Sequence, residues 1–299
     1  MARAAPLVHL IDGSVCVFRA YYALPPMAAP DGTPTNAAYG YANSLVKYLA
    51  DFEPSHAAVA FDHAAKSFRN EIFPAYKAQR DEPPADLEPQ FELCKQVTEA
   101  LGLASFERPA YEADDLIATL VAGVVRRRAR AVIVSTDKDL AQLVREDGRV
   151  SLYDPARREK FDAEGVRARF GVDPGQIPDY LGLMGDAVDN LPGVPGVGKK
   201  SAAAALRAFG RIEKIPADPQ AWAGVAVRGA RRIAALVDEH RERALRTREL
   251  ATVRRDVPGV QATLRTLRYR GAERGAMQAL CERLGWGRIA ARIPRWRGA

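Results

Sequence analysis

Residues 130–140 read RAVIVSTDKDL, an apolar run that leads directly into two aspartates. The run 130–136 has the near-continuous β-branched character of a strand buried on both faces of a parallel sheet, and Asp137 follows it at once. Two earlier runs have the same form, since PLVHLI (6–11) is followed by Asp12 and HAAVAF (56–61) by Asp62. These three runs predict the central strands of an α/β domain.

Helical patterns lie between the strands, and a further strand is expected in RVSLYD (149–154). The helical patterns are AAYGYANSLVKYLADF, FELCKQVTEALGL and DDLIATLVAGVVRRR. This alternation predicts a doubly wound parallel sheet whose ligands bind at the carboxyl ends of the strands. Asp12, Asp62 and Asp137 are therefore expected at one edge, with Asp139 beside them, although an aspartate after a strand also commonly caps the next helix.

The stretch EADD crowds three carboxylates, Glu112, Asp114 and Asp115, at the start of the helix before strand 130–136. Acids in a first turn face the positive end of the helix dipole, which one or two of them would satisfy. A third carboxylate adds like-charge repulsion. Carboxylates held close together either raise the pKa of one of them or bind a cation. Both interpretations stay open for this stretch alone, but its position predicts that it joins the acidic sheet edge.

The block MGDAVDNLPGVPGVGKKSAAAALRAFG (184–210) contains Asp186 and Asp189, three residues apart, followed by a glycine hairpin between two short helical patterns. Exposed N–H groups at the start of the second helix are suited to binding phosphate. The segment from Gly193 to Lys199 nearly fits a P-loop, but Lys200 stands where the Mg²⁺-binding hydroxyl belongs and no buried strand precedes it. A nucleotide triphosphatase is therefore not favoured.

Charge is distributed unevenly along the 299 residues. Residues 1–189 hold 21 basic and 28 acidic side chains, and residues 190–299 hold 23 and 9, so net charges of −7 and +14 sum to +7. This asymmetry indicates an acidic working site joined to a polyanion-binding surface, or only a solvated basic helical face. No membrane span or signal peptide is expected, which predicts a cytoplasmic protein. Three distant cysteines indicate neither disulfides nor a zinc site.

The segment 63–90 is too long for an ordinary connection and is rich in proline and charge. Its Lys66, Arg69, Lys77 and Arg80 are interleaved with Phe68, Phe73 and Tyr76, a composition that suits a nucleic-acid strand through phosphate pairing and base stacking. A solvated insertion has the same composition.

Five blocks in order resemble the 5′-nuclease superfamily, most closely the 5′–3′ exonuclease domain of bacterial DNA polymerase I and its stand-alone relatives. The blocks are LIDGSVCVFRAYYALPP, AVAFDHAAKSFRNEIFPAYKAQR, YEADDLIATL, IVSTDKDLAQLV and LMGDAVDNLPGVPGVGKKSA. The resemblance implies a PIN-like α/β 5′-nuclease domain over 1–175 with an arch region at about 63–90. It also implies a helix-hairpin-helix-type (H3TH) DNA-binding domain over 176–299.

The same resemblance implies the site residues. The implied metal ligands are Asp12, Asp62, Glu112, Asp114, Asp115, Asp137, Asp139, Asp186 and Asp189, which would hold two or more Mg²⁺ or Mn²⁺ ions. The implied catalytic residues are Lys77, Arg80, Asp115 and Asp137. The implied DNA contacts are Arg19, Arg69, Tyr76, Lys77, Arg80, Gly196, Gly198, Lys199 and Lys200, with a potassium ion at the hairpin.

The implied activity is metal-dependent cleavage of DNA at 5′ ends and flaps in primer removal or repair, by a monomer coupled to a separate polymerase and ligase. The chain departs from the pattern at Lys199, where relatives commonly have Glu, at Ser201 in place of Thr, and at His63 in place of a small residue. The alternatives are a non-catalytic reader of branched DNA, a PIN-type ribonuclease and a phosphatase for small nucleotides. A non-catalytic reader would be expected to lack some of the motif acids, and PIN-type ribonucleases are typically shorter. A phosphatase for small nucleotides would have no use for the basic C-terminal region.

Overall fold

The computed structural model describes residues 5–261 and 263–298, which fall into two compact units. Unit 1 contains the residues up to Ala65, the segment Glu82–Thr136 and the residues from Arg254 onward. Unit 2 contains Lys66–Asp81 and Asp137–Val253. The predicted boundary at residue 175 between a nuclease and a DNA-binding domain stays a prediction.

Unit 1 is built on four parallel strands in the order β3-β2-β1-β4. They are β1 (Leu7–Asp12), β2 (His56–Ala60), β3 (Ala104–Phe106) and β4 (Arg130–Val134). Ile11 aligns with Val59 and Val134 across the three central strands, and all three side chains are buried. The strands expected from the three apolar runs are confirmed, whereas the short β3 was not predicted.

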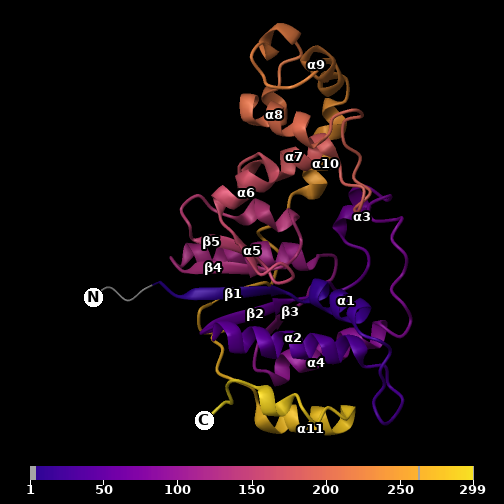
Figure 1. Cartoon of the computed structure of the whole chain (residues 1–299), viewed down its shortest axis with the longest axis vertical. Helices are drawn as coiled ribbons and strands as arrows, with labels where there is room; N and C mark the ends of the chain where they lie inside the picture. Colours follow the sequence, from indigo (N-terminus) through magenta and orange to yellow (C-terminus); the bar gives the residue numbers. More distant parts are fainter. Residues whose placement is uncertain (1–4, 262, 299) are drawn as a thin grey trace. The chain divides into compact units, whose positions relative to one another are not determined.

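Helices cover both faces of this sheet, as in a doubly wound fold (Figure 1). α2 and α4 lie along one face and α5 packs against β1, β2 and β4 on the other. α11 packs against the outer side of α4. The bounds are α1 Gly13–Ala23, α2 Asn36–Phe52, α4 Glu88–Ala100, α5 Ala113–Arg126, α11 Arg274–Leu284 and the 3-10 turn Ala290–Arg292.

The C-terminal segment of unit 1 returns to the start of β2. The backbone N–H of Ala57 donates to Leu267 O (2.9 Å), and that of Tyr269 donates to Ser55 O (3.0 Å). Because β3 pairs with β2 only from Ala58 onward, residues 267–269 occupy the side of β2 that β3 leaves unpaired. The C-terminal part of the chain therefore contains an extended segment at residues 267–269, which the sequence did not predict.

Unit 2 is mainly helical, with one antiparallel pair of strands, β5 (Val150–Asp154) and β6 (Glu159–Phe161). α7 and α10 pack closely together, with Leu181, Leu183 and Ala244 buried. Its helices are α3 Phe68–Ile72, α6 Ala163–Phe170, α7 Ile177–Met184, α8 Lys199–Phe209, α9 Ala230–Glu239 and α10 Arg241–Ala251. Its 3-10 turns are Asp139–Leu143, Pro174–Gln176, Ile212–Lys214 and Pro219–Trp222.

No helix within residues 5–261 and 263–298 combines the length and the apolar character that crossing a membrane requires.

Candidate active site

Two of the predicted acids lie at the carboxyl edge of the unit 1 sheet. Asp12 is the last residue of β1, and it caps α1 by accepting a hydrogen bond from the Val15 N–H (3.1 Å). Its second oxygen accepts from Ser135 Oγ (2.8 Å), directly after β4. Asp62 follows β2, and its backbone N–H donates to Ser14 Oγ (2.8 Å). These bonds hold the two carboxylates at the ends of neighbouring strands.

The EADD stretch is tied to the same edge, because Asp62 Oδ1 accepts a hydrogen bond from the Ala113 N–H (2.7 Å) at the start of α5. Asp115 is fully buried, and its two oxygens accept from the backbone N–H groups of Glu112 (3.2 Å) and Arg254 (2.8 Å). Asp115 therefore performs the helix-capping task, while Glu112 and Asp114 are partly exposed. The metal-binding and catalytic roles of Asp115 stay predictions.

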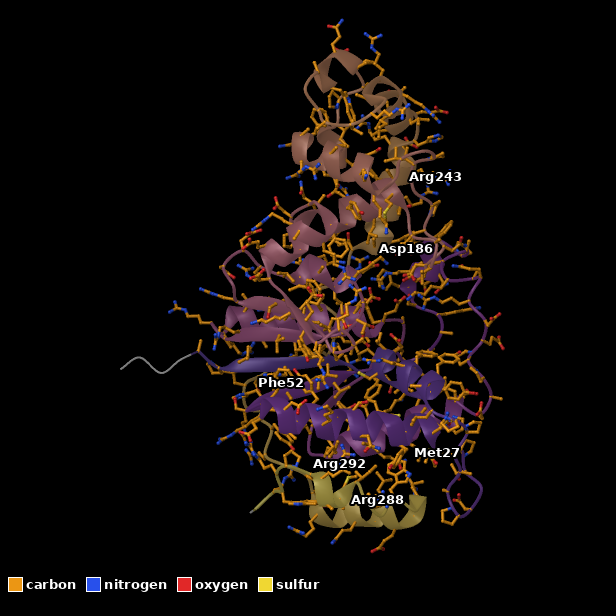
Figure 2. All side chains as sticks on the ribbon, viewed as in Figure 1. Met27, Phe52, Asp186, Arg243, Arg288 and Arg292 are labelled. Carbon is orange, nitrogen blue, oxygen red and sulfur yellow. The ribbon has the colours of Figure 1, made fainter. Side chains whose placement is uncertain are left out.

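In unit 2, a tight loop after α7 carries Asp186 and Asp189. Asp186 and Leu191 exchange two backbone hydrogen bonds (2.9 and 2.8 Å), which close the loop. Gly185 makes this possible, because its φ is +76° and a Cβ there would lie 2.5 Å from the N atom of Gly193. Asp186 is buried and accepts the Val188 N–H (2.8 Å). Figure 2 labels Asp186 on this loop.

Asp137 and Asp139 stand on the turn that leads into the 3-10 turn Asp139–Leu143. Asp137 Oδ1 accepts the Asp139 N–H at 2.8 Å. The ammonium group of Lys138 is hydrogen-bonded to Asp186 and lies 3.4 Å from Asp139 Oδ1. Four of the predicted metal ligands therefore lie in unit 2, and Lys138 contacts two of them.

Asp139 has the most perturbed environment of these acids. Its Oδ1 is buried and accepts no hydrogen bond within the described part of the chain. Burial, and next the charge of Asp137, raise the pKa of Asp139 to about 7. A divalent cation prefers oxygen donors, and it would offset the repulsion between the carboxylates and provide a partner for the oxygen that accepts no hydrogen bond. The carboxylate oxygen of Asp139 therefore has the donor chemistry that a hard cation prefers.

The nine predicted ligands are divided between the units, with five in unit 1 and four in unit 2. No three His, Cys, Asp or Glu side chains among the described residues stand in a group that could hold a metal ion. The combined metal centre that the sequence implies therefore stays a prediction.

The predicted arch residues of unit 2 contact the loop that carries Asp189. Tyr76 is buried and its hydroxyl donates to Asp189 Oδ2 (3.1 Å), while Arg80 Nη2 lies 2.5 Å from Asp189 Oδ1. Lys77 Nζ lies 3.9 Å from Asp189 Oδ2, and the Lys77 backbone adopts φ +55° while its N–H donates to Asp189 O (3.0 Å). The structure thus brings three predicted residues onto one predicted metal ligand.

Arg69 has a different environment, because it is buried and its Nε donates to the carbonyl of Leu250 at the end of α10 (2.7 Å). In this arrangement it anchors α3 within unit 2, and its predicted DNA contact gains no support. Arg19 is exposed on α1 of unit 1.

The glycine hairpin has the form that the sequence predicts. Gly196 adopts φ +78°, and Gly198 precedes α8, whose first residues are Lys199 and Lys200. No side chain caps this helix, and Gly198 and both lysines are exposed. Unsatisfied N–H groups at a helix start, next to two ammonium groups, attract phosphate.

Comparison with protein families identifies the chain. The model described as "5'-3' exonuclease, N-terminal resolvase-like domain" matches residues 7–171, and "5'-3' exonuclease, C-terminal SAM fold" matches residues 172–275. The chain belongs to the 5′–3′ exonuclease family. The resemblance deduced from the five sequence blocks is thereby confirmed, as are the α/β fold and the assignment as a 5′–3′ exonuclease.

Curated relatives agree with this assignment. The chain is 41% identical over 208 residues to a 5′–3′ exonuclease of Aquifex aeolicus, and the alignment covers 70% of this chain and 71% of the relative. It is 39% identical over 279 residues to DNA polymerase I of Bacillus caldotenax, and this alignment covers 93% of this chain and 31% of the relative. The chain thus spans about a third of the length of the DNA polymerase I relatives it matches.

Solved structures share the fold of the exonuclease. A zinc-bound T5 5′-exonuclease aligns with TM-score 0.66 at 22% identity, over 93% of this chain and 99% of that one. The catalytic core of Rad2 in complex with DNA aligns with TM-score 0.63 at 14% identity, over 97% and 92%.

Sequence reasoning missed several residues that organise the exonuclease site. Ser135 and Ser14 hold Asp12 and Asp62 through hydroxyl groups, and Lys138 contacts Asp139 and Asp186. The only sequence signal for Lys138 is its place between two aspartates, and this spacing carries no information about Asp186.

Proposed function

We propose that this 5′–3′ exonuclease hydrolyses DNA phosphodiester bonds at free 5′ ends and at 5′ flaps, using divalent cations. The observation that carries the proposal is the buried oxygen of Asp139, which accepts no hydrogen bond from the described residues and lies among three further acids, in a chain that retains all nine acids of the motif pattern. A reader of branched DNA has no use for an acid kept in such an unfavourable environment.

Mg²⁺ or Mn²⁺ would be held by Asp137, Asp139, Asp186 and Asp189 and by the acids of unit 1, namely Asp12, Asp62, Glu112, Asp114 and Asp115. When bound, such ions activate water at neutral pH and stabilise the charge that develops on phosphate. Lys138 contacts Asp186 and Asp139 in this structure, and a bound ion would take its place beside them. A potassium ion at the carbonyl groups near Gly196 and Gly198 belongs to the same proposal.

The arch supplies mobile cations for the scissile phosphate. Lys77 and Arg80 both lie against Asp189, so a metal ion that binds Asp189 and a phosphate that attracts the cations would separate these groups. We assign to Lys77 the stabilisation of the transition state as a point charge. The hairpin with Lys199 and Lys200 would bind the phosphates of the duplex without regard to sequence. A polymerase and a ligase would then act on the same DNA in the cytoplasm.

The proposal is tested by cleavage of a 5′-flap duplex labelled on the flap, with Mg²⁺, Mn²⁺ or EDTA. Plain duplex, single-stranded DNA and RNA serve as alternative substrates, and Asp137→Asn is the inactive control. Metal-dependent cutting at the junction that the variant loses would support the proposal. Tight flap binding without cleavage would make the protein a reader of DNA structure, and preferential cleavage of RNA would make it a ribonuclease.

A further inference from the structure

The C-terminal segment of unit 1 has an unusual charge composition. Residues 254–299 contain eleven arginines, no lysine and three acidic residues, and those from 276 onward lie beyond the match to the second family model. Arginine binds phosphate through two parallel N–H groups and stacks on aromatic rings, whereas lysine acts as a point charge. The arginines of this segment can therefore bind phosphate groups in this paired manner.

Part of this segment lies at the edge of the sheet opposite the acids. Residues 267–269 pair with the first residues of β2, and Arg268 forms a β-bridge with His56. Asp12 and Asp62 stand at the other ends of the same parallel strands. Strands of five or six residues separate the two edges by about 17–20 Å. A group bound at one edge is therefore distinct from a group bound at the other.

A surface hollow of about 470 Å³ is lined here by Arg268, Tyr269, Arg270 and Arg295, which we call the arginine hollow. The three arginines are exposed, no carboxylate lines the hollow, and in the described ranges none of the three forms an ion pair. The Arg295 guanidinium lies 5.6 Å from the centre of the Tyr269 ring, and the Arg295 carbonyl accepts the Ala272 N–H (2.9 Å). Three like charges are thus held together without a balancing acid.

Tyr269 lines the hollow together with the three arginines. Its side chain is buried, and its hydroxyl makes no hydrogen bond to any described residue. A buried hydroxyl without a partner is costly, so such groups usually have one. An anionic oxygen among the guanidinium groups would relieve their repulsion.

We propose that the arginine hollow binds phosphate groups of a nucleic-acid backbone, as a contact separate from the acidic edge. The exposure of all three guanidinium groups favours a polyanion, because pockets for small ligands bury most of the ligand surface. A polyanion also gains from the release of its condensed counterions. The inference rests on the proposed function, because it takes nucleic acid as the partner.

The test compares Arg268→Ala/Arg270→Ala with Arg283→Ala/Arg288→Ala. All four arginines are exposed and lie in the same segment, and Arg288 lies beside α11 (Figure 2). Binding of a fluorescent 5′-flap duplex in EDTA is measured by anisotropy between about 50 and 200 mM salt. Loss of two phosphate contacts should reduce the slope of log Kd against log salt by about 1.8. With Mg²⁺, the hollow variant should show a raised KM and an unchanged kcat.

Each outcome decides between alternatives. A reduced slope in the hollow variant alone supports the inference, whereas equal losses in both variants would reduce it to a general effect of charge. Unchanged DNA binding, together with loss of calorimetric binding of AMP or inorganic phosphate, would make the hollow a small-phosphate site and overturn the assignment to nucleic acid. Failure of the wild type itself to bind DNA would refute the proposed function, and circular dichroism melting identifies a variant that is unfolded.

Discussion

Replacing Asp139 by Asn should stabilise the metal-free protein at alkaline pH. The Asp139 side chain is 13% exposed, one of its oxygens has no hydrogen-bond donor, and Asp137, Asp186 and Asp189 oppose its charge while Lys138 favours it. Its pKa is raised from 3.8 to about 7, first by burial. Asparagine has the same shape and carries no charge.

The sign and size follow from proton linkage. Between pH 3.8 and about pH 7 the folded protein retains a proton that the unfolded chain has lost, so the stability contributed by protonated Asp139 falls as the pH rises through this window. At 1.36 kcal/mol per unit, the complete penalty is about 4 kcal/mol above pH 7. The advantage of Asp139→Asn should therefore be about 2.5 kcal/mol larger at pH 8 than at pH 5.

Urea unfolding in EDTA at pH 5, 6, 7 and 8 measures this difference, with Asp147→Asn as the matched control in unit 2. The pKa of Asp147 is lowered to about 2, chiefly by its hydrogen bond from Arg145, so its replacement should give no alkaline gain. A stability difference for Asp139→Asn that does not vary with pH would refute the reasoning, as would an equal gain in the control. Added Mg²⁺ should stabilise the wild type more than the Asp139 variant.

Three further predictions concern unit 2. Lys138→Met should tighten binding of Mg²⁺ or Mn²⁺ severalfold in low-salt calorimetry, because no ammonium then competes for Asp186; unchanged affinity would contradict this. Lys77→Ala should slow single-turnover flap cleavage by about 10² while changing DNA affinity little, and a loss confined to binding would defeat the assignment. Gly185→Ala should lower the free energy of unfolding by at least about 1–2 kcal/mol, because the backbone φ is positive there and the added Cβ would be crowded by backbone atoms. Gly175→Ala is the control and should have a much smaller effect, because no atom lies within 4 Å of its added Cβ.

The central strands could be predicted because burial on both faces leaves a continuous apolar run. β1, β2 and β4 have such runs, and a parallel sheet places their carboxyl ends together, so Asp12 and Asp62 could be located from the sequence. β3 has only three residues, none of them fully buried, and therefore leaves no comparable pattern. The extended residues 267–269 were missed because pairing with β2 depends on where β3 begins, which is a property of the assembled sheet.

The positions of the acidic residues were easier to predict than the role of each carboxylate. EADD looks uniform in sequence, yet Asp115 bonds to the backbone of Arg254, 139 residues further along the chain, while Asp114 remains partly exposed. Burial and long-range donors decide which carboxylate caps a helix and which stays available for a cation. Neither quantity is encoded by local spacing.

The contacts of Asp189 indicate how the arch could respond to its substrate. Asp189 is a predicted metal ligand, yet Arg80 lies 2.5 Å from it and the Tyr76 hydroxyl donates to it. A cation bound by Asp189 would compete with Arg80 for the same oxygens, and it would therefore weaken the contact between the loop and the arch residues. The Arg80 guanidinium would then be available to phosphate, which binds arginine through paired hydrogen bonds. Metal and DNA should therefore bind cooperatively. The metal would displace Arg80 from Asp189 and leave it available to DNA, and DNA would draw Arg80 away and leave Asp189 available to the metal.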